Sequence, residues 1–290
     1  MHTTLVSPAD LRPHLDDAGW VMLDVRHDLG DTDAGRRAFA QGHIAGAQFV
    51  HLDHDLSGAR RFDVSPGGQR SDGGRHPLPE REPLRERLQQ LGISDSTQVV
   101  AVDAQAGMYA ARLWWLLRWL GHERVAVLDG GLPAWTAAGF PLVAEVRGAR
   151  PAGVLTPRPA LVEVASIDTV FDNLATQALR VVDARSPDRF RGENETLDPV
   201  GGHIPGAVNR FFKDNLDASG RFKDPAALRA EWSAVVGDDA SRAVMHCGSG
   251  VTACHNLLAL DIAALPGASL YAGSWSDWVS DPARPVARGS

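Results

Sequence analysis

The residues best suited to chemistry lie in one short run, the sequence HCGSGVT at residues 246–252. An apolar segment typical of a strand precedes the run, and a helical pattern follows it. Cys247 would therefore lie at a helix N-terminus, where the helix dipole and free backbone N–H groups stabilise a thiolate and any anion attached to its sulfur. Gly248 and Gly250 let backbone amides approach that sulfur closely. The context predicts a nucleophile, whereas a lone cysteine is by default a small buried hydrophobic residue.

Two hydroxyl groups and a second thiol accompany Cys247. Ser249 and Thr252 can offer hydroxyls within the same loop, and Cys254 follows about two helical turns after the nucleophile. We interpret Cys254 as a packing residue, with a redox role as the alternative. Histidines flank both cysteines, but a zinc site is discounted because the chain has no paired Cys-x-x-Cys motif. We expect neither a metal nor a cofactor.

The two halves of the chain repeat each other. Four landmarks recur in the same order, namely VMLDVR at 21–26 with VVDAR at 181–185, GHIAGA at 42–47 with GHIPGA at 202–207, VVAVD at 99–103 with AVMHC at 243–247, and LDGG…W at 128–135 with YAGS…W at 271–278. Such ordered repetition indicates two homologous domains. Cys247 corresponds to Asp103, which cannot be a sulfur nucleophile, so we predict one active domain and one inactive domain.

Each half alternates short apolar runs with helical patterns. Strands are predicted at 20–24, 47–51, 98–102, 125–128, 180–183, 207–209, 242–246 and 269–271, and helices notably at 107–120 and 252–264. Strands separated by helices predict an α/β fold, in which two tandem domains each have a parallel sheet with helices on both faces. We place the first domain at 1–145, a Gly- and Pro-rich linker at 146–160, and the catalytic domain at 161–290.

The first half carries an insertion within residues 53–79. The spacing from its Gly-His-Ile motif to the end of the next repeated strand is longer than in the second half. The surplus falls in a polar stretch that contains glycine, arginine, aspartate and histidine. A long irregular segment in a compact unit is typical of a functional loop, with a solvated surface loop as the alternative.

Composition excludes several classes of function. The 290 residues are 44% hydrophobic and carry a formal net charge of −7, so no overall basic field invites nucleic acid or an anionic membrane. Two cysteines cannot build a disulfide framework, and residues 1–20 lack the apolar core of a secretory signal. The apolar stretch at 113–120 is interrupted by Arg118 and too short to span a bilayer. We therefore predict a cytoplasmic protein that acts on a small molecule.

These landmarks resemble the two-domain rhodanese superfamily over nearly the whole chain. The resemblance is carried by the Asp-x-Arg, Gly-His-Ile-x-Gly-Ala and Gly-Ser-Trp-x-x-Trp motifs. The loop at 247–252 is similar to that of 3-mercaptopyruvate sulfurtransferases. Gly248 and Ser249 are neutral, where thiosulfate sulfurtransferases typically carry basic residues that suit a doubly charged substrate. The resemblance therefore favours 3-mercaptopyruvate as the sulfur donor.

The resemblance implies sulfur transfer through a covalent intermediate. The Cys247 thiolate would attack the sulfur of 3-mercaptopyruvate, become a persulfide and release pyruvate. Cyanide, a thiol or thioredoxin would then accept the outer sulfur. The loop would bind the persulfide through oriented backbone amides. The loop residues expected to bind in this way are Gly248, Gly250, Val251 and Thr252.

The family also uses a Ser–His–Asp relay. The matching residues are Ser249, His76 and Asp63, with Asp72 as a rival for the acidic position. Because His76 and Asp63 lie in the insertion of the first half, the resemblance implies that Cys247 works at an interface between the domains.

Arginines after the second Asp-x-Arg bind the substrate carboxylate in this family. Arg189 matches the first of them, and a guanidinium can fork onto a carboxylate. The second position falls near Leu197, where this chain has no arginine. Arg191 is a candidate replacement and is otherwise a surface charge. Arg26 and Arg185 are expected to brace the fold by pairing with nearby carboxylates.

Three other functions remain open at this stage. One is a thiosulfate:cyanide sulfurtransferase, and another is a persulfide carrier that delivers sulfur to a partner protein. A cysteine phosphatase is the third, and it is disfavoured because phosphate-binding loops of that kind typically end in an arginine that is missing after Thr252.

Overall fold

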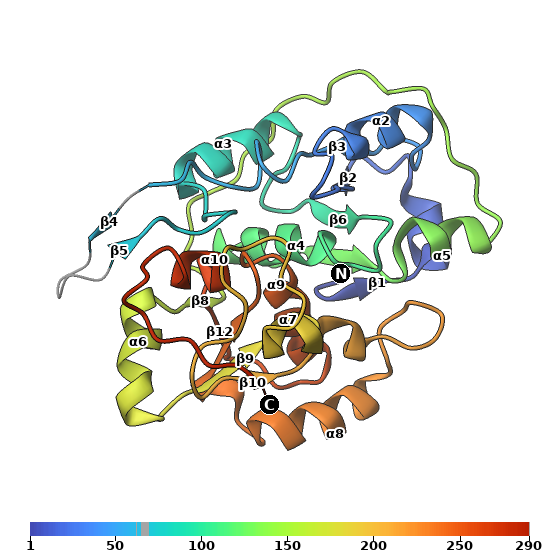
Figure 1. Ribbon diagram of the computed structural model, residues 1–290. Helices are drawn as coiled ribbons and strands as arrows, with labels where there is room; N and C mark the ends of the chain where they lie inside the picture. The colour runs from blue at the N-terminus through green and yellow to red at the C-terminus, as the bar shows by residue number, and fades with distance from the viewer. Residues whose placement is uncertain (62, 65–69, 290) are drawn as a thin grey trace. The chain divides into compact units, whose positions relative to one another are not determined.

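The computed structural model describes residues 1–61, 63–64 and 70–289, and of residues 63 and 64 it describes the backbone alone. These residues form two compact units (Figure 1). The first unit comprises Met1–Ser57, Pro79–Leu161 and Ala218–Arg221, and the second comprises Gly58–Leu78, Val162–Asp217 and Phe222–Ser290. Most of the insertion found in the sequence therefore belongs to the second unit. The domain boundaries drawn from the sequence stay a prediction.

The first unit has a parallel sheet of five strands within the described residues, in the order β1-β7-β6-β2-β3. These strands are β1 (Leu5–Val6), β7 (Val125–Leu128), β6 (Gln98–Val102), β2 (Trp20–Asp24) and β3 (Gln48–Phe49). The flanking helices are α1 (Pro8–Leu11), η1 (Arg12–His14), α2 (Ala34–Gln41), α3 (Arg81–Gln90), α4 (Ala110–Trp119) and α5 (Gly131–Ala137). The central strand β6 is buried along its whole length, as expected for the apolar residues 99–102 that make up all of it after Gln98.

The second unit repeats this topology, with strands in the order β8-β12-β11-β9-β10. These strands are β8 (Glu163–Val164), β12 (Ser269–Leu270), β11 (Ala243–His246), β9 (Arg180–Asp183) and β10 (Val208–Asn209). The flanking helices are α6 (Ile167–Thr176), α7 (Pro187–Arg191), η2 (Phe212–Asn215), α8 (Pro225–Val236), η3 (Ala240–Arg242), α9 (Thr252–Ile262) and α10 (Ser274–Trp278). The matching strand order confirms the predicted duplication and the α/β fold with parallel sheets.

Each sheet packs its own apolar core. In the first unit, Trp135 of α5 and Phe39 of α2 join the buried strand residues, and in the second unit Trp275 and Trp278 of α10 do so. The repeated tryptophan of the two halves therefore fills equivalent cores. Helix α9 is buried over nearly all of its length, so its packing in the core fixes the end of the loop that precedes it.

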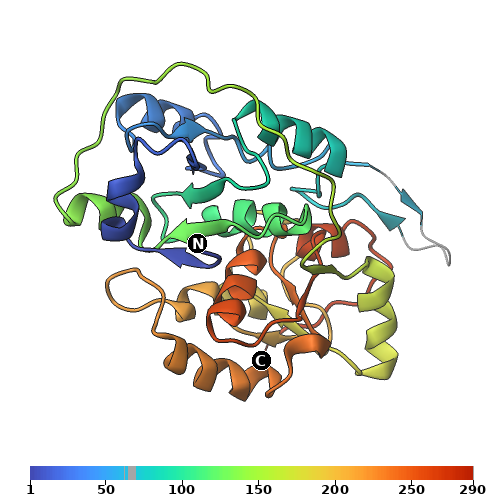
Figure 2. The same ribbon diagram turned by 180° about the vertical axis from the view of Figure 1, so that it is seen from behind.

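The insertion adds a small antiparallel pair of strands, β4 (Asp63–Val64) and β5 (Arg70–Ser71). Residues 146–160, predicted as a linker, have neither helix nor strand and run along the first unit (Figure 2). They are fastened there, because Thr156 Oγ1 donates to Asp95 Oδ2 at 2.7 Å. No described helix has the length and apolarity needed to cross a membrane.

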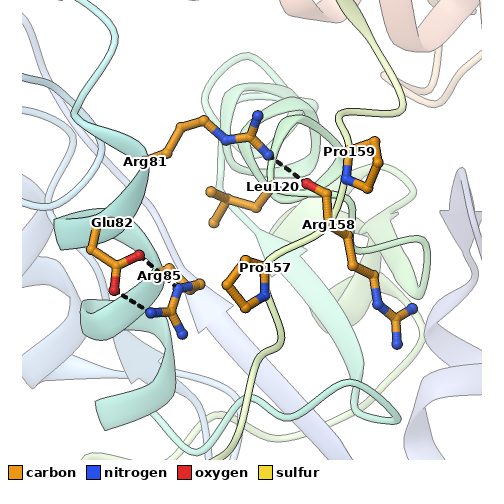
Figure 3. Close-up of a pocket in the computed structure, with 7 residues that line it drawn as sticks. All are labelled: Arg81, Glu82, Arg85, Leu120, Pro157, Arg158 and Pro159. Carbon is orange, nitrogen blue, oxygen red and sulfur yellow. Dashed lines mark hydrogen bonds and ion pairs between the residues drawn. The ribbon is translucent and has the colours of Figure 1, made fainter.

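A surface pocket of the first unit opens where residues 157–159 pass α3 (Figure 3). Arg81 Nη2 donates to the carbonyl of Arg158 at 2.8 Å, and Arg85 pairs with Glu82 on the same helix. The pocket contains none of the residues to which the sequence assigned chemistry.

Candidate active site

Cys247 directly follows β11, the central strand of the second sheet, and its side chain is buried. The residues up to Val251 form a loop, and α9 begins at Thr252. The backbone N–H of Ser249 donates to Cys247 Sγ at 3.5 Å, so an amide dipole points at the sulfur. The backbone N–H of Cys247 donates to Ser274 Oγ at 3.1 Å. The thiol thus stands at a helix N-terminus, a position that stabilises negative charge on sulfur.

Gly250 gives the loop its shape. Its φ is +74°, and a Cβ built there would lie 2.3 Å from the carbonyl oxygen of Ala272, so no side chain fits. Cys254 braces the same turn, because its S–H donates to the carbonyl of Gly250 at 3.3 Å. Both cysteines are free thiols. The packing role of Cys254 stays a prediction.

His76 and Ser249 are in direct contact. Nδ1 of His76 lies 2.7 Å from Oγ of Ser249, and both residues are buried. The loop residue beside the nucleophile is therefore joined to a titratable ring, an arrangement suited to moving a proton. Because residues 58–78 belong to the second unit, this contact lies within that unit. The sequence had led us to expect His76 as a contribution from the first domain.

A carboxylate of α10 holds the segment that carries His76. Asp277 Oδ1 accepts hydrogen bonds from Ser71 Oγ at 2.9 Å and from the backbone N–H of Asp72 at 3.0 Å. Its Oδ2 accepts from the Tyr271 hydroxyl at 2.8 Å. Burial raises the pKa of Asp277, and these hydrogen bonds offset only part of that effect. One residue before Asp277 in α10, Ser276 Oγ accepts from the backbone N–H of Arg75 at 2.9 Å.

The predicted relay has two candidates for its acidic member, Asp63 and Asp72. The backbone of Asp63 forms part of β4, but its side chain lies outside the described part of the chain. Asp72 Oδ1 accepts from the backbone N–H of Gly74 at 2.8 Å, so this carboxylate shapes the turn before His76. Asp63 in the relay therefore stays a prediction.

Arg189 of α7 is held beside the loop by two acids. Its Nε and Nη2 donate to Glu195 at 3.0 and 2.8 Å, and Nη2 lies 3.4 Å from Asp198 Oδ2. Burial favours the neutral form of Glu195, but the Arg189 hydrogen bond and a backbone N–H outweigh it and hold the pKa below its usual value. A Cβ built on Gly248 would lie 3.5 Å from Arg189 Nη2. The guanidinium of Arg189 therefore lies beside Gly248, the residue that follows Cys247.

The other arginines named from the sequence have structural settings. Arg191 donates twice to Glu193 at 2.8 Å on the surface, which agrees with a surface charge. Arg185 forms a buried ion pair with Asp183 at 2.6 Å, and Arg26 forms the equivalent pair with its own strand-end aspartate at 2.7 Å. The Asp-x-Arg landmark therefore braces the carboxyl end of each sheet.

Sequence reasoning missed Arg75, which also faces the loop. Its Nη2 would lie 3.2 Å from a Cβ built on Gly248. Its Nη1 lies 2.6 Å from Asp198 Oδ1. Asp277, which holds this stretch, was missed as well. Comparison of the two repeats offered a signal, because Tyr271, Ser276 and Asp277 replace Leu128, Pro133 and Ala134 at the matching positions.

In the first unit, the carboxylate of Asp103 takes the position that Cys247 has in the second unit. The carboxylate of Asp103 follows β6 and accepts four backbone N–H groups of the loop that leads into α4. The distances are 3.0 Å from Gln105, 2.9 Å from Gly107, 2.9 Å from Tyr109 and 3.0 Å from Ala110. The cradle that the sequence predicts for a persulfide is therefore occupied by a carboxylate in this unit, and the four N–H groups have an acceptor within the chain.

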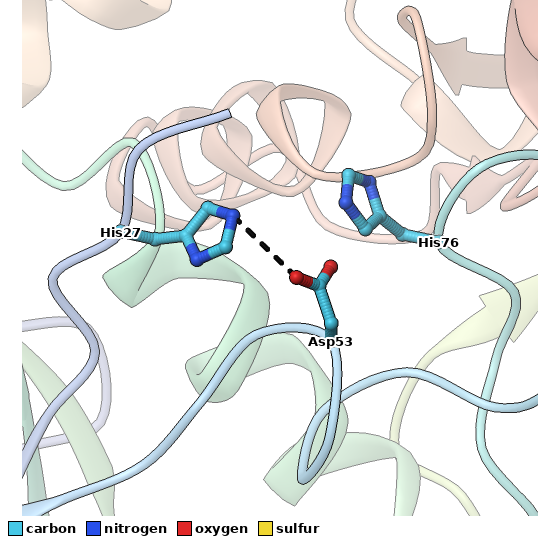
Figure 4. A group of neighbouring side chains, drawn as sticks. All are labelled: His27, Asp53 and His76. Carbon is cyan, nitrogen blue, oxygen red and sulfur yellow. Dashed lines mark ion pairs between the residues drawn. The ribbon is translucent and has the colours of Figure 1, made fainter. Parts of the chain in front are cut away.

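Imidazoles line the same sheet edge of the first unit. Nε2 of His27 faces Asp53 at 3.9 Å (Figure 4), and Nδ1 of His51 lies at the same distance from that carboxylate. Burial is the main cause that lowers the pKa of His27, so its ring is neutral near pH 7. Polar side chains thus gather at the carboxyl ends of the strands, as in other open parallel sheets.

Comparison with known proteins agrees with this geometry. A family model described as the rhodanese-like domain matches residues 7–138 and 166–281. The chain is 44% identical over 287 residues to a probable 3-mercaptopyruvate sulfurtransferase of Pseudomonas aeruginosa, covering 98% of both chains. It is 38% identical to a putative thiosulfate sulfurtransferase, SseB, of Mycobacterium tuberculosis, covering 93% of this chain and 91% of that one.

A solved structure shares the fold. The crystal structure of SseA from Escherichia coli, described as a 3-mercaptopyruvate sulfotransferase, matches with a TM-score of 0.78 and 30% identity. The match covers 95% of this chain and all of that one. Two parallel-sheet units, one with a cysteine at a helix N-terminus, define a tandem rhodanese architecture. The chain belongs to the rhodanese family, and its curated relatives are sulfurtransferases.

Proposed function

We propose that the protein transfers the thiol sulfur of 3-mercaptopyruvate, as the sulfane sulfur of a persulfide on Cys247, to a thiol or to cyanide. The observation that carries the proposal is the joint environment of the thiol. The N–H of Ser249 donates to Cys247 Sγ, and the hydroxyl of the same serine contacts His76 at 2.7 Å. One residue therefore connects the nucleophile to an imidazole ring.

The reaction balances with the groups present. The Cys247 thiolate attacks the sulfur of the donor, a new S–S bond forms, and the C–S bond breaks with its electron pair passing to the enolate of pyruvate. The thiol proton of the donor passes through Ser249 and His76 to the enolate, which becomes pyruvate, and the persulfide is left with a negative charge. Loop amides stabilise the charge of the persulfide. Attack of cyanide or a thiolate on the outer sulfur then restores the Cys247 thiolate.

The charges around the loop favour a singly charged donor. Three arginines, at positions 75, 185 and 189, are paired with three acids, at positions 183, 195 and 198. Burial is the main cause that lowers the pKa of His246, which is therefore neutral near pH 7. No net positive charge remains in this group to offset the second charge of thiosulfate. Thiosulfate is nevertheless the second candidate donor, because SseB is named for it.

Two further features belong to the proposal. Thioredoxin or a small thiol is the expected acceptor, and an obligatory persulfide carrier would instead need a protein partner. The two free thiols suit a reducing compartment such as the cytoplasm.

Steady-state assays with 3-mercaptopyruvate and with thiosulfate, each with cyanide as acceptor, test the proposal. We expect a higher kcat/KM with 3-mercaptopyruvate, and a mass gain of one sulfur atom on Cys247 when the acceptor is omitted. Cys247→Ser should abolish both signals, whereas Cys254→Ser is the matched control. Turnover retained in Cys247→Ser would refute the proposal, and a stable persulfide without turnover would favour the carrier.

A further inference from the structure

We propose that Arg75 is the second anion-binding residue of the donor site and acts with Arg189 on the carboxylate of a 2-oxo acid thiol. The inference deepens the proposed function and rests on it for the identity of the donor. Arg75 would then take the place of the arginine that the family resemblance implies near Leu197.

The position of Arg75 comes from the loop itself. A Cβ added to Gly248 would lie 3.2 Å from Nη2 of Arg75 and 3.5 Å from Nη2 of Arg189. Two guanidinium groups therefore stand together over the backbone of the residue that follows the nucleophile. A Cβ at position 248 would touch Arg189 and press on Arg75, so the absence of a side chain at Gly248 gives both guanidinium groups room there.

One buried acid aligns both arginines. Asp198 Oδ1 is 2.6 Å from Arg75 Nη1, and its Oδ2 is 3.4 Å from Nη2 of each arginine. Sharing a carboxylate offsets the repulsion between two cations, and it leaves guanidinium donors for a ligand. Arg75 Nε has no acceptor among the described residues. Two neighbouring guanidinium groups that still have unused N–H donors can bind both oxygens of a carboxylate.

Arg75 also reaches the place of the missing arginine. Its Nη1 donates to the carbonyl oxygen of Leu197 at 3.3 Å. Leu197 has no charge, but the guanidinium of Arg75 lies against its backbone. Arg75 therefore supplies the positive charge that an arginine at position 197 would have carried. Arg191, the candidate from the sequence, is instead occupied by Glu193 on the surface.

The backbone at Arg75 is fixed in a way that suits a binding residue. Its N–H donates to Ser276 Oγ, and the preceding Gly74 has a φ of +74°. A Cβ on Gly74 would lie 2.3 Å from the carbonyl of Gly273, so this turn packs directly on the start of α10. A preorganised guanidinium loses little entropy when the ligand binds.

Alkylation of Cys247 tests the inference without relying on turnover. Iodoacetate carries a carboxylate and iodoacetamide does not, so the ratio of their rates reports carboxylate steering at the thiol. We expect Arg75→Ala to lower this ratio about tenfold, Arg75→Lys to lower it less, and the surface variant Arg191→Ala to leave it unchanged. Thermal unfolding of each variant, and the iodoacetamide rate itself, show whether the loop is intact.

Kinetics then identify the ligand. Arg75→Ala should raise KM for 3-mercaptopyruvate by about tenfold and affect thiosulfate turnover less. An unchanged alkylation ratio in folded Arg75→Ala would overturn the inference, and equal losses with both donors would overturn its assignment to a carboxylate. If the wild-type protein failed to turn over 3-mercaptopyruvate, the proposed function would be refuted, whereas the alkylation ratio would still decide the role of Arg75.

Discussion

Nδ1 of His76 lies 2.7 Å from Oγ of Ser249, although 173 positions separate the two residues in the chain. The contact exists because Asp277 and Ser276 bind the segment that precedes His76. Duplication supplied both units with the same strand order, and the insertion then added a side chain that the repeated scaffold lacks. The chemistry of the second unit therefore depends on residues from outside the repeat.

Replacement of Ser249 should separate its two contributions. Ser249→Ala keeps the backbone N–H that donates to Cys247 Sγ but removes the hydroxyl that contacts His76. We expect kcat for 3-mercaptopyruvate to fall about 10²-fold, the usual effect of losing one proton-transfer group. His76→Asn should cause a similar loss, and the double variant should lose little more, because the two residues act as a unit. Additive losses would contradict this, and Ser233→Ala on α8 is the control.

Gly250 provides a test of loop geometry. Gly250→Ala must adopt a φ of +74° and accommodate a Cβ 2.3 Å from the Ala272 carbonyl. The expected loss of unfolding free energy is roughly 3 kcal/mol, from left-handed strain and overpacking together, and activity should fall with it. Gly139 has a φ of +79° but open space around it, so Gly139→Ala should cost only about 1 kcal/mol and leave activity intact. Urea unfolding and kcat/KM measure both, and equal effects would contradict the clash.

Asp277 acts at a distance from the sulfur and should behave as a positioning residue. Asp277→Ala removes the acceptor for Ser71, Asp72 and Tyr271. We expect KM for 3-mercaptopyruvate to rise and the alkylation ratio of iodoacetate to iodoacetamide to fall, because Arg75 is carried by the same segment. Asp281→Ala, three residues after the last turn of α10, is the control. A loss of thermal stability with an unchanged ratio and KM would show a purely structural role.

The sequence was sufficient for the longer elements. The predicted strands at 20–24, 98–102, 125–128 and 180–183 match β2, β6, β7 and β9, since each contains a run of consecutive apolar residues. The edge strands β1 and β8 have two residues each and were not predicted, whereas the equally short edge strands β3 and β10 lie within the predicted runs 47–51 and 207–209, beside the repeated Gly-His-Ile motif. Short strands at sheet edges depend on a neighbour for their hydrogen bonds rather than on their own pattern.

Only the part of the site that is contiguous in the sequence could be predicted from local patterns. Cys247, Ser249 and the loop glycines are contiguous, so their chemistry is visible in one motif. His76 was named through a family resemblance, and the contact with Ser249 is a matter of tertiary packing. Arg75 was missed because nothing local distinguishes it from the other arginines of a polar insertion. Only the packing of that segment on α10 shows which arginine faces Gly248.

Asp103 should be essential to the stability of the first unit. Removing its carboxylate would leave four backbone N–H groups without their acceptor, so Asp103→Ala should cost about 3 kcal/mol or more of unfolding free energy. Asp103→Asn should rescue little, because its amide group would face N–H donors of the loop. Asp33→Ala, at the start of α2 where no side-chain cap is formed, should change stability by less than about 0.5 kcal/mol. A mild effect of Asp103→Asn in denaturant unfolding would argue against the cradle.

Glu195 should make stability depend on pH in a defined direction. The pKa of its carboxylate is below the usual 4.5, because the Arg189 hydrogen bond and backbone N–H groups outweigh the effect of burial. A lowered pKa in the folded state means that the ionised form stabilises the fold above pH 4.5 and that this stabilisation is lost as pH falls through the folded pKa. Glu195→Gln should therefore be less stable than wild type by roughly 1–3 kcal/mol at pH 7, and the difference should shrink in acid. Unfolding at several pH values measures it, with the exposed Glu193→Gln as the matched control. A difference that stayed constant well below pH 4.5 would show that Glu195 holds Arg189 by something other than its charge.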